Sequence, residues 1–236
     1  DAAGTIFLSR ASREAFQTRH GCLEGRTAII PHGVSRRFDH SSVEDSSDLR
    51  FTNGGSFRGV YGSPIRLYKH QWNVVRAIQI LRGDGYRARL DLAGHSKSKA
   101  MKKLRPVVQE ADPNNEFITY HGRVPHEKID ELYDRADAFV FASTCETFGQ
   151  VLTEAMQAGL PIACSDRSAA PEVVQEAGTY FDPEQPYDIA NAMRRLMDND
   201  ELRREKAKIA RRRAETFTWD RCAHDTFSFI SELARN

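Results

Sequence analysis

Residues 143–159 read Ser-Thr-Cys-Glu-Thr-Phe-Gly-Gln-Val-Leu-Thr-Glu-Ala-Met-Gln-Ala-Gly and place two carboxylates, Glu146 and Glu154, on either side of a turn. The preceding run 138–141 is apolar and rich in β-favouring residues, which predicts a buried strand. Residues 150–158 have the composition and spacing of a helix. The stretch is therefore expected to run from strand through a tight turn into helix.

Such a junction predicts an anion site at the start of the helix. The first N–H groups of a helix have no partner inside it, and the helix dipole favours negative charge at the same place. We expect the backbone of Thr147, Phe148 and Gly149 to cradle a phosphate, with Gly149 allowing close approach and Gln150 beginning the helix.

The spacing of the two carboxylates adds a second constraint. Eight residues along a helical path span roughly 12 Å, comparable to the distance from a hexose across a diphosphate to a ribose. An ionised carboxylate accepts hydrogen bonds from two neighbouring hydroxyls, so Glu146 and Glu154 suit the two ends of a nucleotide sugar. The alternative is that Glu146 caps the helix and Glu154 is a solvated surface acid.

The segment resembles the signature of family-four retaining glycosyltransferases of the GT-B fold, in which two glutamates separated by seven residues precede a Gly-Leu-Pro turn. The resemblance covers about residues 5–233. Further segments fit the family in order: Ile30-Pro-His-Gly-Val34, Tyr68-Lys-His-Gln71, Leu90-Asp-Leu-Ala-Gly94, Ile118-Thr-Tyr-His-Gly-Arg-Val124, Leu132-Tyr133, Ala136-Asp137, Leu160-Pro-Ile-Ala-Cys-Ser-Asp166, Glu172-Val-Val174 and Phe217-Thr-Trp219.

The rest of the chain alternates short apolar strands with amphipathic helices, the pattern of a parallel sheet covered on both faces. We predict an α/β fold, a Rossmann-like doubly wound parallel sheet that forms the C-terminal half of a GT-B enzyme. The expected strands are 27–30, 58–61, 89–93, 116–121, 138–141, 161–163 and 179–181. The expected helices are 71–82, 98–110, 127–135, 150–158, 171–175, 186–197, 201–216 and 219–234.

Three segments make up the expected domain organisation. Residues 1–24, with a strand at 5–8 and a helix at 10–19, resemble the tail of an N-terminal acceptor domain and its hinge. Residues 25–218 are expected to form the nucleotide-sugar donor-binding domain, and 219–236 a C-terminal helix. The stretch 35–56 is rich in Ser, Asp, Arg and Gly and predicts a mobile loop.

Composition excludes several classes. The 236 residues, 40% hydrophobic, are enough for one sizeable core, and 34 basic against 33 acidic residues give no argument for nucleic-acid binding. The four cysteines are widely spaced, which argues against a zinc site or a disulfide framework. Without a long apolar run or a signal-peptide pattern, we expect a cytoplasmic protein.

Lys69 is the predicted cationic partner of the leaving diphosphate, where it would offset charge on the β-phosphate. The family places an arginine five residues earlier, but this chain has Pro64 there. Arg66 is a candidate replacement. The alternative for Lys69 is a solvated surface lysine. If nothing replaces the missing arginine, leaving-group stabilisation is weaker or another residue of the whole enzyme supplies the charge.

Arg123 and Val124 follow a predicted strand where similar proteins contact the nucleotide base through the backbone, although Arg123 also fits an ordinary surface arginine. Gly62 ends another strand on the expected ligand side, where a small residue permits close approach.

Two charged motifs have competing interpretations. Residues 198–200 have the Asp-x-Asp form of metal-dependent transferases of another fold, but Asp200 fits better as a helix N-cap, so no metal site is expected. A basic run along one terminal helix fits a solvated face or, alternatively, contact with anionic lipid headgroups: Arg203, Arg204, Lys206, Lys208, Arg211, Arg212 and Arg213.

The resemblance implies a retaining hexosyltransferase of carbohydrate biosynthesis that takes a UDP-, GDP- or ADP-sugar without a metal cofactor. Glu146 and Lys69 would be catalytic. The acceptor, a carbohydrate or a lipid-linked sugar, would bind to an N-terminal domain. Any membrane contact would be peripheral and at the inner face. Two rivals remain open: a nucleotide-sugar epimerase of the same fold, and a non-catalytic nucleotide-sugar-binding or regulatory module.

Overall fold

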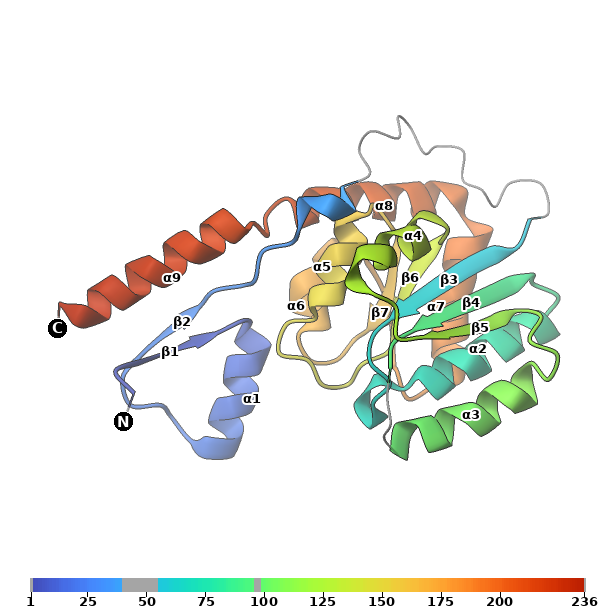
Figure 1. Cartoon of the computed structure of the whole chain (residues 1–236), viewed down its shortest axis with the longest axis horizontal. Helices are drawn as coiled ribbons and strands as arrows, with labels where there is room; N and C mark the ends of the chain where they lie inside the picture. The colour runs from blue at the N-terminus through green and yellow to red at the C-terminus, as the bar shows by residue number, and fades with distance from the viewer. Residues whose placement is uncertain (1, 40–54, 96–98, 236) are drawn as a thin grey trace.

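A computed structural model describes residues 2–39, 55–95 and 99–235. Its main body is a six-stranded, all-parallel sheet in the order β5-β4-β3-β6-β7-β8 (Figure 1). The strands are β3 (Phe57–Gly62), β4 (Ala88–Ala93), β5 (Ile118–Gly122), β6 (Ala138–Phe141), β7 (Ile162–Ser165) and β8 (Gly178–Phe181). The predicted doubly wound α/β fold is confirmed.

Helices cover both faces of this sheet, which is why its central strands are apolar on both sides. Every residue of β6 and β7 is buried. One layer contains α2 (Gln71–Gly83), α3 (Lys99–Ala111) and α7 (Pro186–Asp198). The other contains α4 (Ile129–Asp134), α5 (Gln150–Gln157), α6 (Ala170–Val174) and α8 (Asp200–Ala214).

The strand order reverses between β3 and β6. From β3 the chain adds β4 and then β5 on one side, and it then returns to place β6 on the other side of β3. In open parallel sheets a ligand binds outside the carboxyl ends of the strands at such a switch point. The loops that follow β3 and β6 are therefore the first place to look for a site.

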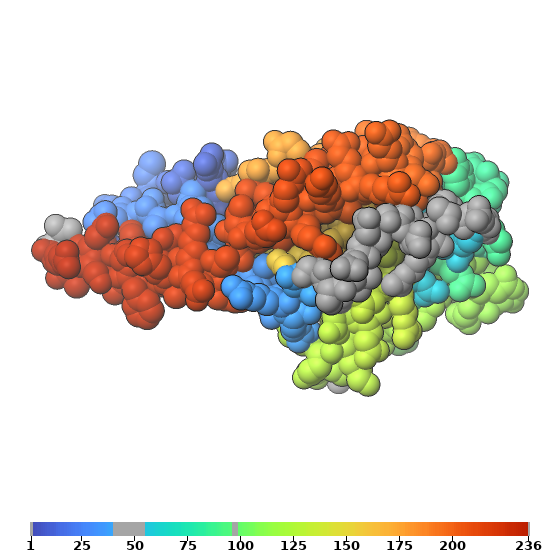
Figure 2. All heavy atoms as spheres, turned by 90° about the horizontal axis from the view of Figure 1, so that it is seen from above, coloured from blue at the N-terminus to red at the C-terminus, as the bar shows by residue number. Residues whose placement is uncertain are grey.

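A second, two-stranded parallel sheet pairs β1 (Gly4–Phe7) with β2 (Arg26–Ile29) across the helix α1 (Arg10–His20). The terminal helix α9 (Trp219–Ala234) runs beside this small sheet, and Arg26 pairs with Glu232 at 2.5 Å. Figure 2 shows α8 and α9 along one side of the molecule, with the N-terminal segment beside α9.

Four predictions about elements need correction. The strand predicted at 27–30 exists, but it pairs with β1 and not with the main sheet. The loop predicted at 35–56 is wrong at its start, because η1 (Arg36–Phe38) is a 3-10 turn whose Phe38 is fully buried; residues 40–54 lie outside the described residues.

The strand predicted from 116 begins two residues later. Asp112 accepts hydrogen bonds from the N–H groups of Glu116, Phe117 and Ile118 at 2.7–2.8 Å. These bonds hold the approach to β5 as a turn, and they lower the pKa of Asp112 against the effect of burial. The helix predicted at 127–135 is divided into η3 (His126–Lys128) and α4.

Candidate functional site

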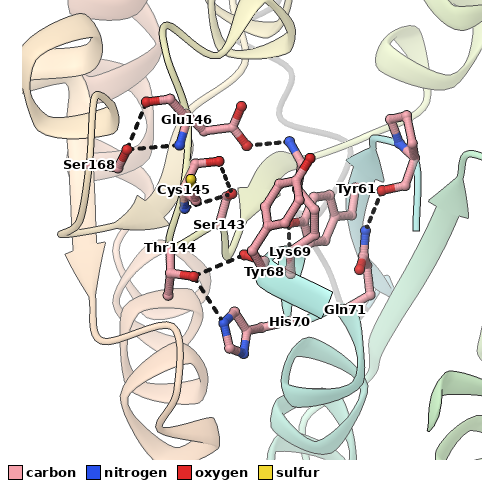
Figure 3. Close-up of polar contacts among 11 residues, drawn as sticks. Tyr61, Tyr68, Lys69, His70, Gln71, Ser143, Thr144, Cys145, Glu146 and Ser168 are labelled. Carbon is pink, nitrogen blue, oxygen red and sulfur yellow. Dashed lines mark hydrogen bonds and ion pairs between the residues drawn. The ribbon is translucent and has the colours of Figure 1, made fainter. Parts of the chain in front are cut away.

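The loops after β3 and β6 meet at the switch point through an ion pair. The ammonium of Lys69, at the end of η2 (Leu67–Lys69), contacts the carboxylate of Glu146 in the turn before α5 (Figure 3). The two side chains are only 8% and 14% exposed. The structure thus brings together two residues 77 positions apart that the sequence proposed as the catalytic pair.

Lys69 is held by its backbone as well as by its charge. The hydroxyl of Tyr61, in β3, donates to the Lys69 carbonyl at 2.6 Å. The N–H of Thr144 donates to the Tyr68 carbonyl at 2.8 Å, which fastens the two loops together. His70 takes a left-handed conformation, with φ of 47°, to turn the chain into α2.

Burial lowers the pKa of Lys69, and the carboxylate of Glu146 opposes that shift. The Lys69 ammonium also lies 4.7 Å from the ring centroid of Phe141. The Glu146 carboxylate is thus the anionic partner that favours the charged form of this largely buried ammonium.

The turn that carries Glu146 is fixed from two sides. The Ser168 hydroxyl, on the β7–α6 connection, accepts from the Glu146 N–H at 2.8 Å and donates to the Glu146 carbonyl at 2.8 Å. From the N-terminal segment, the Ser9 hydroxyl donates to the Thr147 carbonyl at 2.6 Å. Glu172, in α6, accepts from the first N–H groups of α1 at 2.9 and 3.0 Å, so the start of α1 is fastened both to this turn and to α6.

The sequence interpretation did not name Ser9, Ser168 or Glu172 as part of the site. Ser9 carried one usable signal: it begins a capping box with Ser12, which marks the start of α1. Nothing in the sequence indicated that the same hydroxyl would reach a residue 138 positions away.

The predicted phosphate cradle consists of a buried Phe148, an exposed Thr147 and the start of α5 after Gly149, where no side chain caps the helix. Phe148 is 2% exposed, and its ring packs against His32 and Phe217 with centroids 5.9 and 5.5 Å away. Thr147 is exposed. Gly149 has φ of 87°, a left-handed conformation that favours glycine, and α5 begins after it without a side-chain cap. The N-terminus of α5 is therefore available to an anion.

Gln150 has a structural contact. Its side-chain amide donates to the Gly33 carbonyl at 2.8 Å. Gly33 itself lies against the start of α9, since a Cβ there would come within 2.2 Å of the Trp219 nitrogen. Gln150 thus ties the start of α5 to the segment that joins β2 to the main body.

Glu154 lies on the buried side of α5 and is 8% exposed. Burial raises its pKa to about 7, and the guanidinium of Arg37 acts in the opposite direction. Among the described residues its carboxylate makes no hydrogen bond and no ion pair. The alternative interpretation of Glu154 as a solvated surface acid is therefore wrong.

The remaining predicted donor residues follow or end strands at the carboxyl end of the sheet, and no hydrogen bond or ion pair joins them to Lys69 or Glu146 among the described residues. Arg123 is exposed and Val124 is half-buried after β5, two strands away from β3. Gly62 ends β3 beneath Tyr133, whose hydroxyl lies 3.3 Å from the position of a Cβ. Arg66 is exposed, and no hydrogen bond or ion pair joins its side chain to another described residue.

The charged motifs of α8 have structural roles. Asn199, not Asp200, is the N-cap, and it accepts from the Leu202 N–H at 2.9 Å. Arg203 is fully buried and pairs with Asp200 at 2.6 Å. Lys206 donates to the Glu176 carbonyl at 2.6 Å, so part of the basic run is used inside the fold. In residues 2–39, 55–95 and 99–235 no group of three His, Cys, Asp or Glu side chains is placed to hold a metal ion.

A doubly wound sheet with an ion-paired lysine, a glycine-initiated helix and two glutamates at its switch point defines an α/β protein whose candidate ligand site lies at the carboxyl ends of its strands. The chain belongs to the family described as glycosyl transferases group 1, whose model matches residues 56–213, more than half of the chain. The resemblance to GT-B enzymes of family four is thereby confirmed.

Curated relatives agree. The chain is 25% identical over 236 residues to D-inositol 3-phosphate glycosyltransferase of Paenarthrobacter aurescens, covering 98% of this chain and 58% of that protein. It is 34% identical over 112 residues to O-antigen chain mannosyltransferase B of Escherichia coli, covering 48% of this chain and 29% of that protein.

Solved structures show the same fold. Sucrose-phosphate synthase of Thermosynechococcus elongatus matches with a TM-score of 0.84 at 24% identity, over 100% of this chain and 59% of that one. HepE of Anabaena, solved in complex with UDP and glucose, matches with a TM-score of 0.83 at 22% identity, over 98% and 63%. The chain thus spans less than two thirds of the proteins it matches. No described helix has the length and apolar character needed to cross a membrane.

Proposed function

We propose that this chain is the donor-binding half of a retaining hexosyltransferase, which binds a nucleoside diphosphate sugar and presents it to an acceptor held by a further domain. The observation that carries the proposal is the buried Lys69–Glu146 ion pair at the β3/β6 switch point, beside the uncapped start of α5. The transferases among the relatives support this function over the epimerase and the non-catalytic module.

Donor binding would exchange the partners of this pair. The β-phosphate replaces the Glu146 carboxylate beside the Lys69 ammonium, and the backbone at the start of α5 holds the same diphosphate. Glu146 is then free to accept hydrogen bonds from the donor sugar hydroxyls. The ion pair therefore keeps both groups charged and oriented until the donor arrives.

Departure of the nucleoside diphosphate leaves an oxocarbenium-like carbon, which the acceptor attacks from the same face. Lys69 stabilises the charge that develops on the leaving phosphate, the electrostatic effect that commonly dominates such catalysis. With Pro64 at the family's arginine position, Arg66 must move to assist, or Lys69 acts as the main cation. Glu154 accepts the two hydroxyls of the ribose.

The proposal extends to substrates and location. The donor is a UDP-, GDP- or ADP-sugar bound without a metal ion, because the lysine and the helix end supply positive charge to the diphosphate. The acceptor is a carbohydrate or a lipid-linked sugar. The enzyme acts in the cytoplasm, with peripheral contact to the inner membrane face if the acceptor is lipid-linked.

Calorimetric titration of the chain with UDP, GDP and ADP, and with the matching monophosphates, tests the function. One diphosphate is expected to bind best. Lys69→Met should weaken that diphosphate about ten- to a hundredfold, the cost of one charged hydrogen bond, and should change monophosphate binding little. The control is Lys102→Met, which alters an exposed lysine of α3. Equal losses for both ligands would remove Lys69 from the β-phosphate, and no binding of any nucleotide by the wild-type chain would contradict the proposed function.

A further inference from the structure

Buried polar atoms without partners gather around Glu154. In the part of the chain that the structure describes, they are Nε and Nη2 of Arg37, the hydroxyl of Tyr133 and Oε1 of Gln150. Buried polar groups in proteins are nearly always hydrogen-bonded, so a cluster of exceptions requires an explanation. A ligand that supplies the missing partners is one.

Three elements bring this cluster together. Arg37 belongs to η1, and its guanidinium lies 4.6 Å from the ring centroid of Phe38. The Phe38 ring lies 5.8 Å from that of Tyr133 in α4. Tyr133, 2% exposed, places its hydroxyl over Gly62, at the carboxyl end of β3. The cluster therefore lies at the carboxyl ends of the strands, as the Lys69–Glu146 pair does.

Charge explains why an arginine is needed there. An ionised carboxylate accepts hydrogen bonds from both hydroxyls of a vicinal diol, whereas a protonated one loses half of that capacity. A carboxylate buried like Glu154 favours its neutral form unless a cation stands near it. A guanidinium is always charged, and Arg37 is the cation that lowers the pKa of Glu154.

Resting on the proposed donor site, we propose that Arg37 is a positioning residue of the ribose subsite: its guanidinium supplies positive charge beside the Glu154 carboxylate and, with the Tyr133 hydroxyl, completes a pocket for the vicinal diol of a nucleotide. Arg37 acts through Glu154 and does not touch the reacting atoms. The contrasting role is a purely structural one, in which Arg37 only stacks on Phe38 and supports the turn.

The test compares two ligands that differ only in the diol. A nucleoside diphosphate that binds the wild-type chain is titrated beside its 2′,3′-dideoxy analogue. The variants are Arg37→Met, the charge-preserving Arg37→Lys, and Arg36→Met as the control, since Arg36 is the exposed neighbour in the same turn.

Arg37→Met is expected to weaken the ordinary nucleotide about tenfold or more, to leave the dideoxy analogue within about twofold, and to be partly rescued by Arg37→Lys. Arg36→Met should change neither ligand. Equal loss for both ligands, or no loss for either, overturns the inference. If Arg37→Met does not fold, Arg37→Lys decides: the inference requires that it still bind the ordinary nucleotide more tightly than the dideoxy analogue. Failure of the wild-type chain to bind any diphosphate is a separate result, which contradicts the proposed function itself.

Discussion

Glu146 and Glu154, eight residues apart in one short segment, differ in how their carboxylates are paired. Glu146 sits in a turn, paired with Lys69 and fixed through its backbone by Ser168. Glu154 sits in a helix, 8% exposed, with a carboxylate that forms no ion pair with a described residue and with a pKa raised to about 7. The first carboxylate forms an ion pair, whereas the second has only the charge of Arg37 nearby and no ion-pair partner among the described residues. A buried acid without an ion-pair partner costs stability, which is typical of groups that are kept for a ligand.

Removal of the ion-pair partner of Glu146 should have the largest effect on the free energy of unfolding. Lys69→Met leaves the Glu146 carboxylate largely buried and unpaired, so we expect a loss of about 3 kcal/mol of unfolding free energy. The double variant Lys69→Met/Glu146→Gln should recover most of that loss. Urea denaturation of the single and double variants measures both. A single variant as stable as the wild type would mean that solvent already compensates Glu146.

Neutralising Glu154, which has no ion-pair partner among the described residues, should instead increase the free energy of unfolding. The folded-state pKa of Glu154 is raised from 4.5 to about 7, so the folded protein holds this proton more tightly than the unfolded chain does. Its contribution to stability is present below pH 4.5 and is lost as the pH rises to about 7. Glu154→Gln should therefore be more stable than the wild type at pH 8, by about 2–3 kcal/mol.

The same variant should match the wild type at about pH 4, below the unfolded-state pKa of 4.5, where the wild-type side chain is mostly neutral in both the folded and the unfolded chain. It should bind the nucleotide more weakly at pH 8. Thermal unfolding at the two pH values, paired with calorimetry, tests this. A Glu154→Gln protein that is less stable at pH 8 would show that the carboxylate has a structural partner.

The smallest expected effect concerns the docking of α1 on the Glu146 turn. Ser9→Ala removes the N-cap of α1 and the bond to the Thr147 carbonyl, at a cost of about 1–2 kcal/mol. Ser12→Ala removes its half of the capping box but keeps the contact with the turn. If the contact matters to the site, only Ser9→Ala should also weaken nucleotide binding; equal effects of the two variants on binding would limit Ser9 to a capping role.

Much of the fold could be predicted because the hydrophobic periodicity of the segments agreed with the positions of the turn residues between them. The strand-turn-helix around Glu146 and the glycine at its turn follow from local composition alone. The pairing of strands cannot be predicted in this way, because alternation reveals a strand but not its neighbour. The strand near 27–30 was therefore assigned to the main sheet, whereas it pairs with β1. That Lys69 and Glu146 would share a site was indicated only through the family resemblance, and their ion pair was not predicted.

Arg37 was missed for a physical reason. It lies in a polar stretch whose composition predicts a loop, and its one nearby anchor, Phe38, is a single apolar residue without periodic neighbours. Burial of that ring is a tertiary event, which local sequence does not encode. The side chains that complete a site from distant elements are accordingly the part that a single sequence conceals.

The most direct measurement is a crystal structure of the chain with the nucleoside diphosphate that calorimetry selects. The account predicts that the Lys69 ammonium leaves Glu146 for a β-phosphate oxygen and that both ribose hydroxyls donate to Glu154 beside Arg37. A complex in which the Lys69–Glu146 pair stays closed, or in which Glu154 does not contact the ribose, would contradict it.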